Sequence, residues 1–140
     1  MNSNLLTVID LARLTEVESH VIRYYTKIGL LNPDRDSSNG YKFYNKDDAL
    51  RVRFTRKAKS LGYSLNEIKT IFEHAKQGES PCALVREIIT KRLKETQEKI
   101  SELESLQERM KKAIKEWDVV PNKDPDGETI CHLIEGFVDG

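Results

Sequence analysis

The sequence has little of what marks a secreted, membrane-embedded or disulfide-stabilised protein. Its 140 residues include two cysteines, one tryptophan and four prolines, and two cysteines do not make a disulfide framework. No apolar run approaches the roughly 20 residues that a membrane-spanning helix needs, and the N-terminus lacks a signal-peptide layout. These absences predict a cytoplasmic protein with reduced thiols and no membrane association.

The sequence also lacks the patterns that accompany catalysis. It contains no glycine-rich phosphate loop and no nucleophile at a recognisable spacing from a base. Of its three histidines, His74 and His132 lie in segments that are better explained by regulation. We therefore do not expect an enzyme.

The charge of the chain is balanced in total but not along its length. Lys and Arg together number 23, as do Asp and Glu, so the net charge is zero. Residues 1–62 hold 11 basic and 7 acidic residues, a net charge of +4, whereas residues 63–140 hold 12 and 16, a net charge of −4. A basic first half followed by an acidic second half is typical of a nucleic-acid-binding domain joined to a different domain.

Apolar residues recur at helical spacing over most of the chain and predict a mainly α-helical protein. Four helices are expected in the first part, over about 7–13, 18–28, 46–61 and 65–76. The predicted organisation has three parts: a winged helix-turn-helix domain over 1–76, a long helix over 81–118, and a C-terminal loop with a short helix over 119–140.

A small hairpin is expected directly after the second helix, which ends at Gly29. The polar stretch 34–39 is predicted as a loop, and Asn39-Gly40 supplies the positive-φ residues of a tight turn. The aromatic residues that follow favour a strand. A helix that carries basic residues outward, followed by such a wing, predicts a winged helix-turn-helix that binds DNA.

The predicted DNA contacts combine cations and hydroxyls that can meet phosphates or base edges. Arg23 and Lys27 lie one helical turn apart, so both can reach one side of a groove. The wing offers further hydroxyls and a cation, whereas Phe43 is expected to point inward. The full set is Ser19, His20, Arg23, Tyr24 and Lys27 on the second helix, Arg35, Tyr41, Lys42 and Tyr44 at the wing, and Arg56 on the third helix.

The long helix carries a heptad pattern that predicts a coiled coil with a second copy of the chain. No other segment is long enough to cover this stripe within one chain. The heptads alone do not decide between parallel and antiparallel pairing. The stripe consists of Ile89, Leu93, Thr96, Ile100, Leu103, Gln107, Met110, Ile114 and Trp117.

Several short motifs carry a family resemblance over nearly the whole chain. They are Thr7-Val-Ile-Asp-Leu-Ala12, Ile22-Arg-Tyr-Tyr25, Gly29-Leu-Leu31, Asn39-Gly-Tyr41, Tyr44 and Leu61-Gly-Tyr-Ser-Leu-Asn-Glu-Ile68. Together they resemble the mercury-resistance-regulator (MerR) family of transcription factors. The chain departs from that pattern at Glu16, where the family often has a turn glycine, at Glu18, often a small polar N-cap, and at Lys42, usually arginine.

The resemblance implies a homodimer joined by an antiparallel coiled coil of the long helices. It also implies binding to a near-palindromic promoter whose polymerase elements are separated by an over-long spacer. The effector-bound dimer is expected to distort this DNA so that RNA polymerase can use it, and so to regulate or activate transcription.

Two cysteines match positions of the family's heavy-metal-responsive branch. The resemblance implies that Cys82, at the start of the long helix, reaches across the dimer to a loop that holds Cys131. Thiolates suit Zn, Cd, Hg or Pb, and His132 is a weaker further candidate. The chain departs from the branch at Trp117, which stands where the first loop cysteine usually lies. More distant oxygen or nitrogen candidates are Asp118, Asp124, Asp126, Glu128 and His74.

Two other effectors remain open from the sequence. The two thiols could instead sense oxidants or electrophiles, although no basic cluster adjoins either of them to favour the thiolate. A small organic molecule could bind beside Trp117, although relatives of that kind usually have a larger C-terminal domain. Either cysteine taken singly is more simply a small buried residue.

Overall fold

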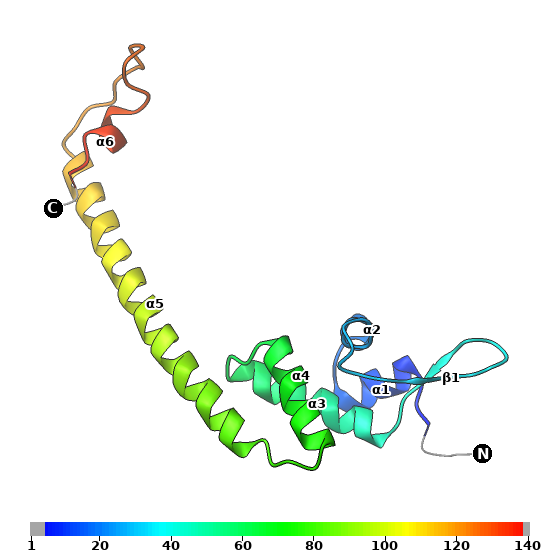
Figure 1. Ribbon diagram of the computed structural model, residues 1–140. Coiled ribbons are helices and arrows are strands. Elements are labelled where there is room, and N and C mark those ends of the chain that lie inside the picture. Colours follow the sequence, from blue (N-terminus) through cyan, green and yellow to red (C-terminus); the bar gives the residue numbers. More distant parts are fainter. Residues whose placement is uncertain (1–4, 139–140) are drawn as a thin grey trace. The chain divides into compact units, whose positions relative to one another are not determined.

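The computed structural model describes residues 5–138 and forms two compact units, the first ending at Arg92 and the second beginning at Leu93. The first unit holds short helices, a hairpin and the start of a long helix, and the second holds the rest of that helix and the C-terminal segment (Figure 1). The elements in order are α1 (Val8–Thr15), α2 (Ser19–Lys27), β1 (Asp34–Arg35), β2 (Lys42–Phe43), α3 (Lys46–Ser60), α4 (Leu65–Lys76), α5 (Cys82–Trp117) and α6 (His132–Glu135).

The helices begin where the capping residues predict. Thr7, Asn45 and Ser64 each accept a hydrogen bond from the third residue of the following helix, whose acidic side chain bonds back to the cap. Each such capping box satisfies two backbone N–H groups that the first turn leaves without partners. The expected helix starts are therefore confirmed, with α1 extending two residues beyond its expected end.

The wing is a two-stranded antiparallel hairpin. Asp34 pairs with Phe43 and Arg35 with Lys42, and a further antiparallel bridge joins Leu6 to Tyr44. The prediction of a loop over all of residues 34–39 is wrong at its first two residues, because backbone pairing with β2 draws them into a strand.

The core of the first unit lies among α1, α2, α3 and α4. Leu11, Ile22, Val52 and Ile68 are fully buried there. Partly buried residues of the first turns of α5, among them Ile88, pack against the same core. The hydrophobic contacts that hold the helix-turn-helix therefore also anchor the start of the long helix.

Two polar contacts strengthen this attachment of α5. The Tyr63 hydroxyl donates to the Val85 carbonyl at 2.7 Å, and Arg92 forms an ion pair with Glu67. The first unit therefore continues to Arg92, because the beginning of α5 is part of its packing.

The second unit combines the rest of α5 with a loop and the single turn of α6. The expected short C-terminal helix is present but limited to His132–Glu135. Among the described residues, no helix is long and apolar enough to cross a membrane.

The turn between α1 and α2 contains the one strained residue of the described backbone. Glu16 has φ 58° and ψ 40°, the left-handed conformation, which costs a residue with a Cβ about 1–2 kcal/mol. This geometry explains why a glycine would suit the position.

Replacing Glu16 with glycine is expected to raise the free energy of unfolding by about 1 kcal/mol, because glycine adopts the left-handed region without steric cost. Urea unfolding of the variant measures the change. Glu16→Ala is the matched control, since alanine retains the Cβ and should bring no such gain. An equal gain in both variants would assign the effect to the lost charge instead.

Candidate nucleic-acid interface and effector site

Helix α2 presents a basic and aromatic face because its other face is fixed in the core. Ile22 and Tyr25 are buried, and burial raises the pKa of the Tyr25 phenol. Arg23, Tyr24 and Lys27 are therefore turned toward solvent, where Tyr24 is half exposed. Of the other predicted contacts on this helix, His20 is exposed and Ser19 is half-buried.

The C-terminal end of α2 is fixed by a left-handed glycine and a lysine from α4. Gly29 has φ 85°, which lets the chain turn directly after the helix. Lys69 donates from Nζ to the Ile28 carbonyl at 2.8 Å, where a cation also favours the helix dipole. This lysine holds α2 in place, a role that no local sequence pattern indicates.

The tip of the wing is organised by two side-chain caps. The Asp36 carboxylate accepts hydrogen bonds from the hydroxyl and backbone N–H of Ser38, which lower the pKa of Asp36. The Asn39 side chain accepts from the Tyr41 backbone N–H at 3.0 Å, and Gly40 adopts φ 72°. The turn therefore leaves the Tyr41 side chain 68% exposed at the edge of β2.

Tyr44, which the sequence predicts as a DNA contact, lies in the core of the first unit. Its side chain is 1% exposed, and its hydroxyl lies 2.7 Å from Thr26 Oγ1. Since Thr26 already donates its own proton to the Ile22 carbonyl at 2.8 Å, the Tyr44 hydroxyl is the donor between them. Tyr44 thus joins the wing to α2. Phe43, expected inward, is half-buried.

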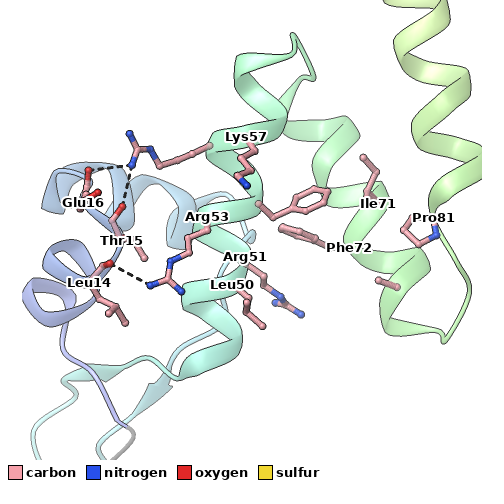
Figure 2. A pocket seen from close by; sticks show the side chains of 13 residues that line it. Leu14, Thr15, Glu16, Leu50, Arg51, Arg53, Lys57, Ile71, Phe72 and Pro81 are labelled. Atoms are coloured by element: carbon pink, nitrogen blue, oxygen red, sulfur yellow. Dashed lines mark hydrogen bonds between the residues drawn. The ribbon is translucent and has the colours of Figure 1, made fainter.

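Arg56 also has a structural role that the sequence did not suggest. Its Nη1 donates to the carbonyls of Thr15 at 3.1 Å and Glu16 at 3.3 Å, and Arg53 reaches the Leu14 carbonyl. These bonds clasp the end of α1 to α3 (Figure 2). The Nη1 group of Arg56 is thus committed to the α1–α2 turn, and the contact of Arg56 with DNA phosphates stays a prediction. At the wing, Arg35 is exposed and Lys42 is half-buried, and both remain candidate DNA contacts.

An open groove of about 820 Å³ lies beside these hydrogen bonds. It is lined by residues of α3, α4 and the α1–α2 turn. Figure 2 shows Phe72 and Leu50 bordering it together with basic side chains of α3. Phe54 and Phe72 lie with ring centroids 5.4 Å apart, and the Arg51 guanidinium lies 5.4 Å from the Phe72 ring centroid. The groove is apolar with a cationic rim.

The two cysteines are accessible to different degrees and lie on different units. Cys82 is exposed at the first residue of α5, and Cys131 is half-buried at the N-cap of α6. Neither is in a disulfide. Both thiols are thus available in the described chain for coordination or modification.

The segment around Cys131 is held by bonds that involve no thiol. The Trp117 indole N–H donates to the Leu133 carbonyl at 3.0 Å, and Trp117 meets Phe137 edge to face with centroids 6.5 Å apart. The Glu135 carboxylate accepts from the backbone N–H groups of Ile130 and Cys131, both at 2.9 Å. Trp117, at the position of an expected cysteine, thus anchors α6 to α5.

His132 is oriented by a backbone carbonyl. Its Nε2 lies 3.1 Å from the Pro121 oxygen, and because a carbonyl only accepts, Nε2 carries the proton. The remaining nitrogen, Nδ1, then has its lone pair available in the neutral ring. In the preceding loop, Asp126 accepts from the Glu128 and Thr129 backbone N–H groups, which lowers its pKa to about 2; this residue therefore shapes the loop.

No group of three or more His, Cys, Asp or Glu side chains within residues 5–138 is placed to hold a metal ion. Of the predicted ligands, Cys131 and His132 are neighbours, and Cys82 belongs to the first unit. One described chain therefore does not complete a tetrahedral site.

Comparison with known proteins decides the family. A model described as MerR HTH family regulatory protein matches residues 6–75, and one described as MerR, DNA binding matches residues 50–113. The chain belongs to the MerR family. The resemblance seen in its motifs is thereby confirmed, and the protein is a DNA-binding transcription regulator rather than an enzyme.

Relatives of this MerR protein include regulators named for metals. It is 32% identical over 99 residues to the HTH-type transcriptional regulator ZntR of Escherichia coli K12, covering 70% of each chain. It is 29% identical over 128 residues to the mercuric resistance operon regulatory protein of Bacillus cereus, covering 90% of this chain and 92% of that one. The fold matches PbrR691 of Ralstonia metallidurans CH34, solved in complex with lead(II), with a TM-score of 0.74, 16% identity and 95% and 99% coverage.

Because Tyr44 is buried and Tyr41 is exposed, removal of their hydroxyls should affect stability differently. Tyr44→Phe removes a buried hydroxyl donor and should lower the free energy of unfolding by about 1 kcal/mol, with the DNA affinity of the folded protein nearly unchanged. Tyr41→Phe should leave stability unchanged. Thermal unfolding and a DNA-binding titration measure the two properties. A large loss of DNA affinity in folded Tyr44→Phe would return that hydroxyl to the interface.

Proposed function

We propose that this MerR-family regulator acts as a homodimer that binds promoter DNA and senses a divalent heavy-metal ion through thiols from both chains. The observation that carries the metal proposal is the distribution of the thiols: Cys82 opens α5 and Cys131 caps α6, and no three potential ligands gather within residues 5–138 of one chain. A second copy can supply the missing ligand.

The DNA-binding part of the proposal rests on α2 and the wing. Exposed Arg23 and Lys27 lie one turn apart on a helix whose opposite face is buried, as a recognition helix in a major groove requires. The exposed Tyr41 and the neighbouring Lys42 can meet the phosphate backbone from the wing. RNA polymerase on the same promoter is the proposed further partner, and the cytoplasm the proposed compartment.

The metal part is supported by donor chemistry and by relatives. Thiolate and imidazole ligands favour soft or borderline ions such as Zn, Cd, Hg and Pb, and the names of two proteins described above refer to mercury and lead. We assign Cys82 of one chain, with Cys131 and the weaker candidate His132 of the other, as ligands. A bound ion would supply a link between the two chains.

The proposed output is a change in DNA geometry. An ion held by both chains favours the dimer arrangement in which all its ligands meet, so it shifts the population toward that state. If that arrangement bends or twists the promoter differently, the deformation of DNA carries the signal. Trp117 contributes indirectly by fixing the segment that carries Cys131.

Arg23→Ala is expected to weaken promoter binding by about tenfold or more, because it removes a cation from the exposed face of α2. The slope of log affinity against log salt should also fall if the contact is to phosphate. Lys94→Ala, which removes an exposed cation from α5, is the charge-matched control. Equal losses in the two variants would contradict a specific role for α2.

Cys82→Ser and Cys131→Ser should each abolish tight binding of the sensed ion while leaving DNA binding nearly intact. Titration of the reduced protein with Zn(II), Cd(II), Hg(II) and Pb(II) measures affinity and stoichiometry. His132→Ala should weaken ion binding less than either cysteine change, and His74→Ala is its control, since His74 pairs with Glu79 elsewhere on the chain.

Full ion binding by Cys82→Ser would contradict the cross-dimer site. If the wild-type protein binds none of the four ions, the metal proposal fails and the DNA-binding regulator stands. An effector would then be sought among oxidants acting on the thiols, or small organic molecules in the apolar cavity of about 360 Å³ beside Trp117.

A further inference from the structure

A second, smaller cavity adjoins the apolar groove of the first unit. It measures about 150 Å³ and is lined by Gly29, Leu30 and Asn32 together with side chains of α3 and α4. The groove of about 820 Å³ and this polar cavity share two lining residues, Arg51 and Phe72. An apolar space and a polar space therefore meet at a single arginine.

We propose that the groove and the polar cavity together bind a small organic carboxylate with an apolar body, oriented so that the carboxylate lies at Arg51. Such a ligand would give the regulator an input that shares no residue with the proposed thiol site. The inference goes beyond the DNA-binding and metal-sensing roles, and it does not depend on the binding of a metal ion.

The apolar body of the ligand is inferred from side chains of the groove that remain in contact with solvent. Leu14 and Leu50 are 47% and 62% exposed, and Phe54 is 39% exposed. The rings of Phe54 and Phe72 are tilted to each other with centroids 5.4 Å apart, so a planar ring or an alkyl chain can lie against them. The groove also has the roughly 300–1,000 Å³ that small-molecule sites usually have. An apolar body bound here would remove these side chains from water.

The negative charge of the ligand is inferred from the cations around the two cavities. Six basic side chains line them, against two acidic ones. The basic residues are Arg51, Arg53, Arg56, Lys57, Lys69 and Lys76. This excess is local, because the whole chain has a net charge of zero. A positive potential over an apolar surface favours an amphipathic anion over a neutral or cationic molecule.

Arg51 is the cation best placed to hold the carboxylate. Arg53, Arg56 and Lys69 already donate to backbone carbonyls. Within residues 5–138, the other three cations form no ion pair with a carboxylate. Of these three, Arg51 is half-buried and lies 5.4 Å from the Phe72 ring centroid (Figure 2). A partly desolvated guanidinium gains more from a carboxylate than an exposed one does, and its planar fork matches two oxygens.

The phosphates of DNA are the other anions that this protein meets, and they fit the groove less well. A phosphate of the duplex backbone carries no apolar body that would cover Leu50 and Phe54. The helix that is proposed to read DNA presents its own cations, Arg23 and Lys27, to solvent. The chemistry of the groove therefore favours a free organic carboxylate.

Calorimetric titration of the reduced, metal-free 140-residue chain tests the ligand class. The probes are 2-naphthoate and octanoate, with 2-naphthamide and octanamide as neutral controls of the same shape. We expect at least one carboxylate to bind with a Kd below about 1 mM and about tenfold more tightly than its amide, because only the carboxylate can pair with Arg51. The absence of binding by both carboxylates, or equal binding of carboxylate and amide, would overturn the proposal.

Two substitutions test the location of the site. Arg51→Met keeps a long apolar side chain and should weaken carboxylate binding by about tenfold or more, whereas Arg13→Met, at an exposed arginine outside both cavities, should not. Leu50→Gln should weaken binding by about fivefold, whereas Ile9→Gln, at another half-exposed residue of the same unit, should not. Unchanged binding in Arg51→Met or in Leu50→Gln would place the ligand elsewhere and overturn the proposal.

A promoter titration of Arg51→Met distinguishes a free carboxylate from DNA phosphate. Without added carboxylate and at equal salt, this variant should bind promoter DNA within about twofold of the wild-type affinity, because the arginine makes no phosphate contact. A loss as large as that expected for Arg23→Ala would place Arg51 in the DNA interface and overturn the proposal. Neither result depends on the thiols, so a failed metal titration would not alter them.

Discussion

The apolar stripe of α5 is the constraint on which the rest of this molecule depends. Five of its large side chains, Leu93, Ile100, Leu103, Met110 and Ile114, stand at least half exposed, and burying each would contribute on the order of 1–2 kcal/mol. A second copy of the helix would satisfy this requirement. Dimerisation would then do two things at once: it would set the separation of two DNA-reading units, and it would bring a thiol at the start of one α5 toward the loop after the other.

The DNA-reading surface depends on the same core that anchors α5. Ile22 and Tyr25 fix one face of α2, Tyr44 ties the wing to Thr26, and the start of α5 packs on the helices behind them. A change of geometry at the long helix can therefore act on a rigidly held recognition helix. The C-terminal segment is also ordered without a thiol, because Trp117 and Glu135 hold it through backbone groups. An ion would then be bound by a largely preformed loop.

Local signals predicted much of the fold, because capping, helical periodicity and turn chemistry are encoded by neighbours in the sequence. Thr7, Asn45 and Ser64 begin the helices as expected. The structural roles that local signals did not predict all involve long-range contacts. Strand alternation predicts that the Tyr44 side chain points outward. It is instead buried, because Tyr44 pairs with Leu6 and its hydroxyl bonds to Thr26. Arg56 donates to the carbonyls of Thr15 and Glu16, which lie 41 and 40 residues earlier in the sequence. The contacts of Trp117 join residues 16 apart or more, which no local pattern records.

The most direct test of the account uses a mixed dimer of Cys82→Ser and Cys131→Ser chains, isolated with two affinity tags and titrated with the ion that the wild-type protein binds. A site shared between chains leaves one complete thiol pair in this heterodimer, formed by Cys82 of one chain and Cys131 of the other. The account predicts one tightly bound ion per heterodimer, against two per wild-type dimer and none in either mutant homodimer. A heterodimer that binds no ion, beside a wild-type dimer that binds two, would contradict a site assembled across the dimer.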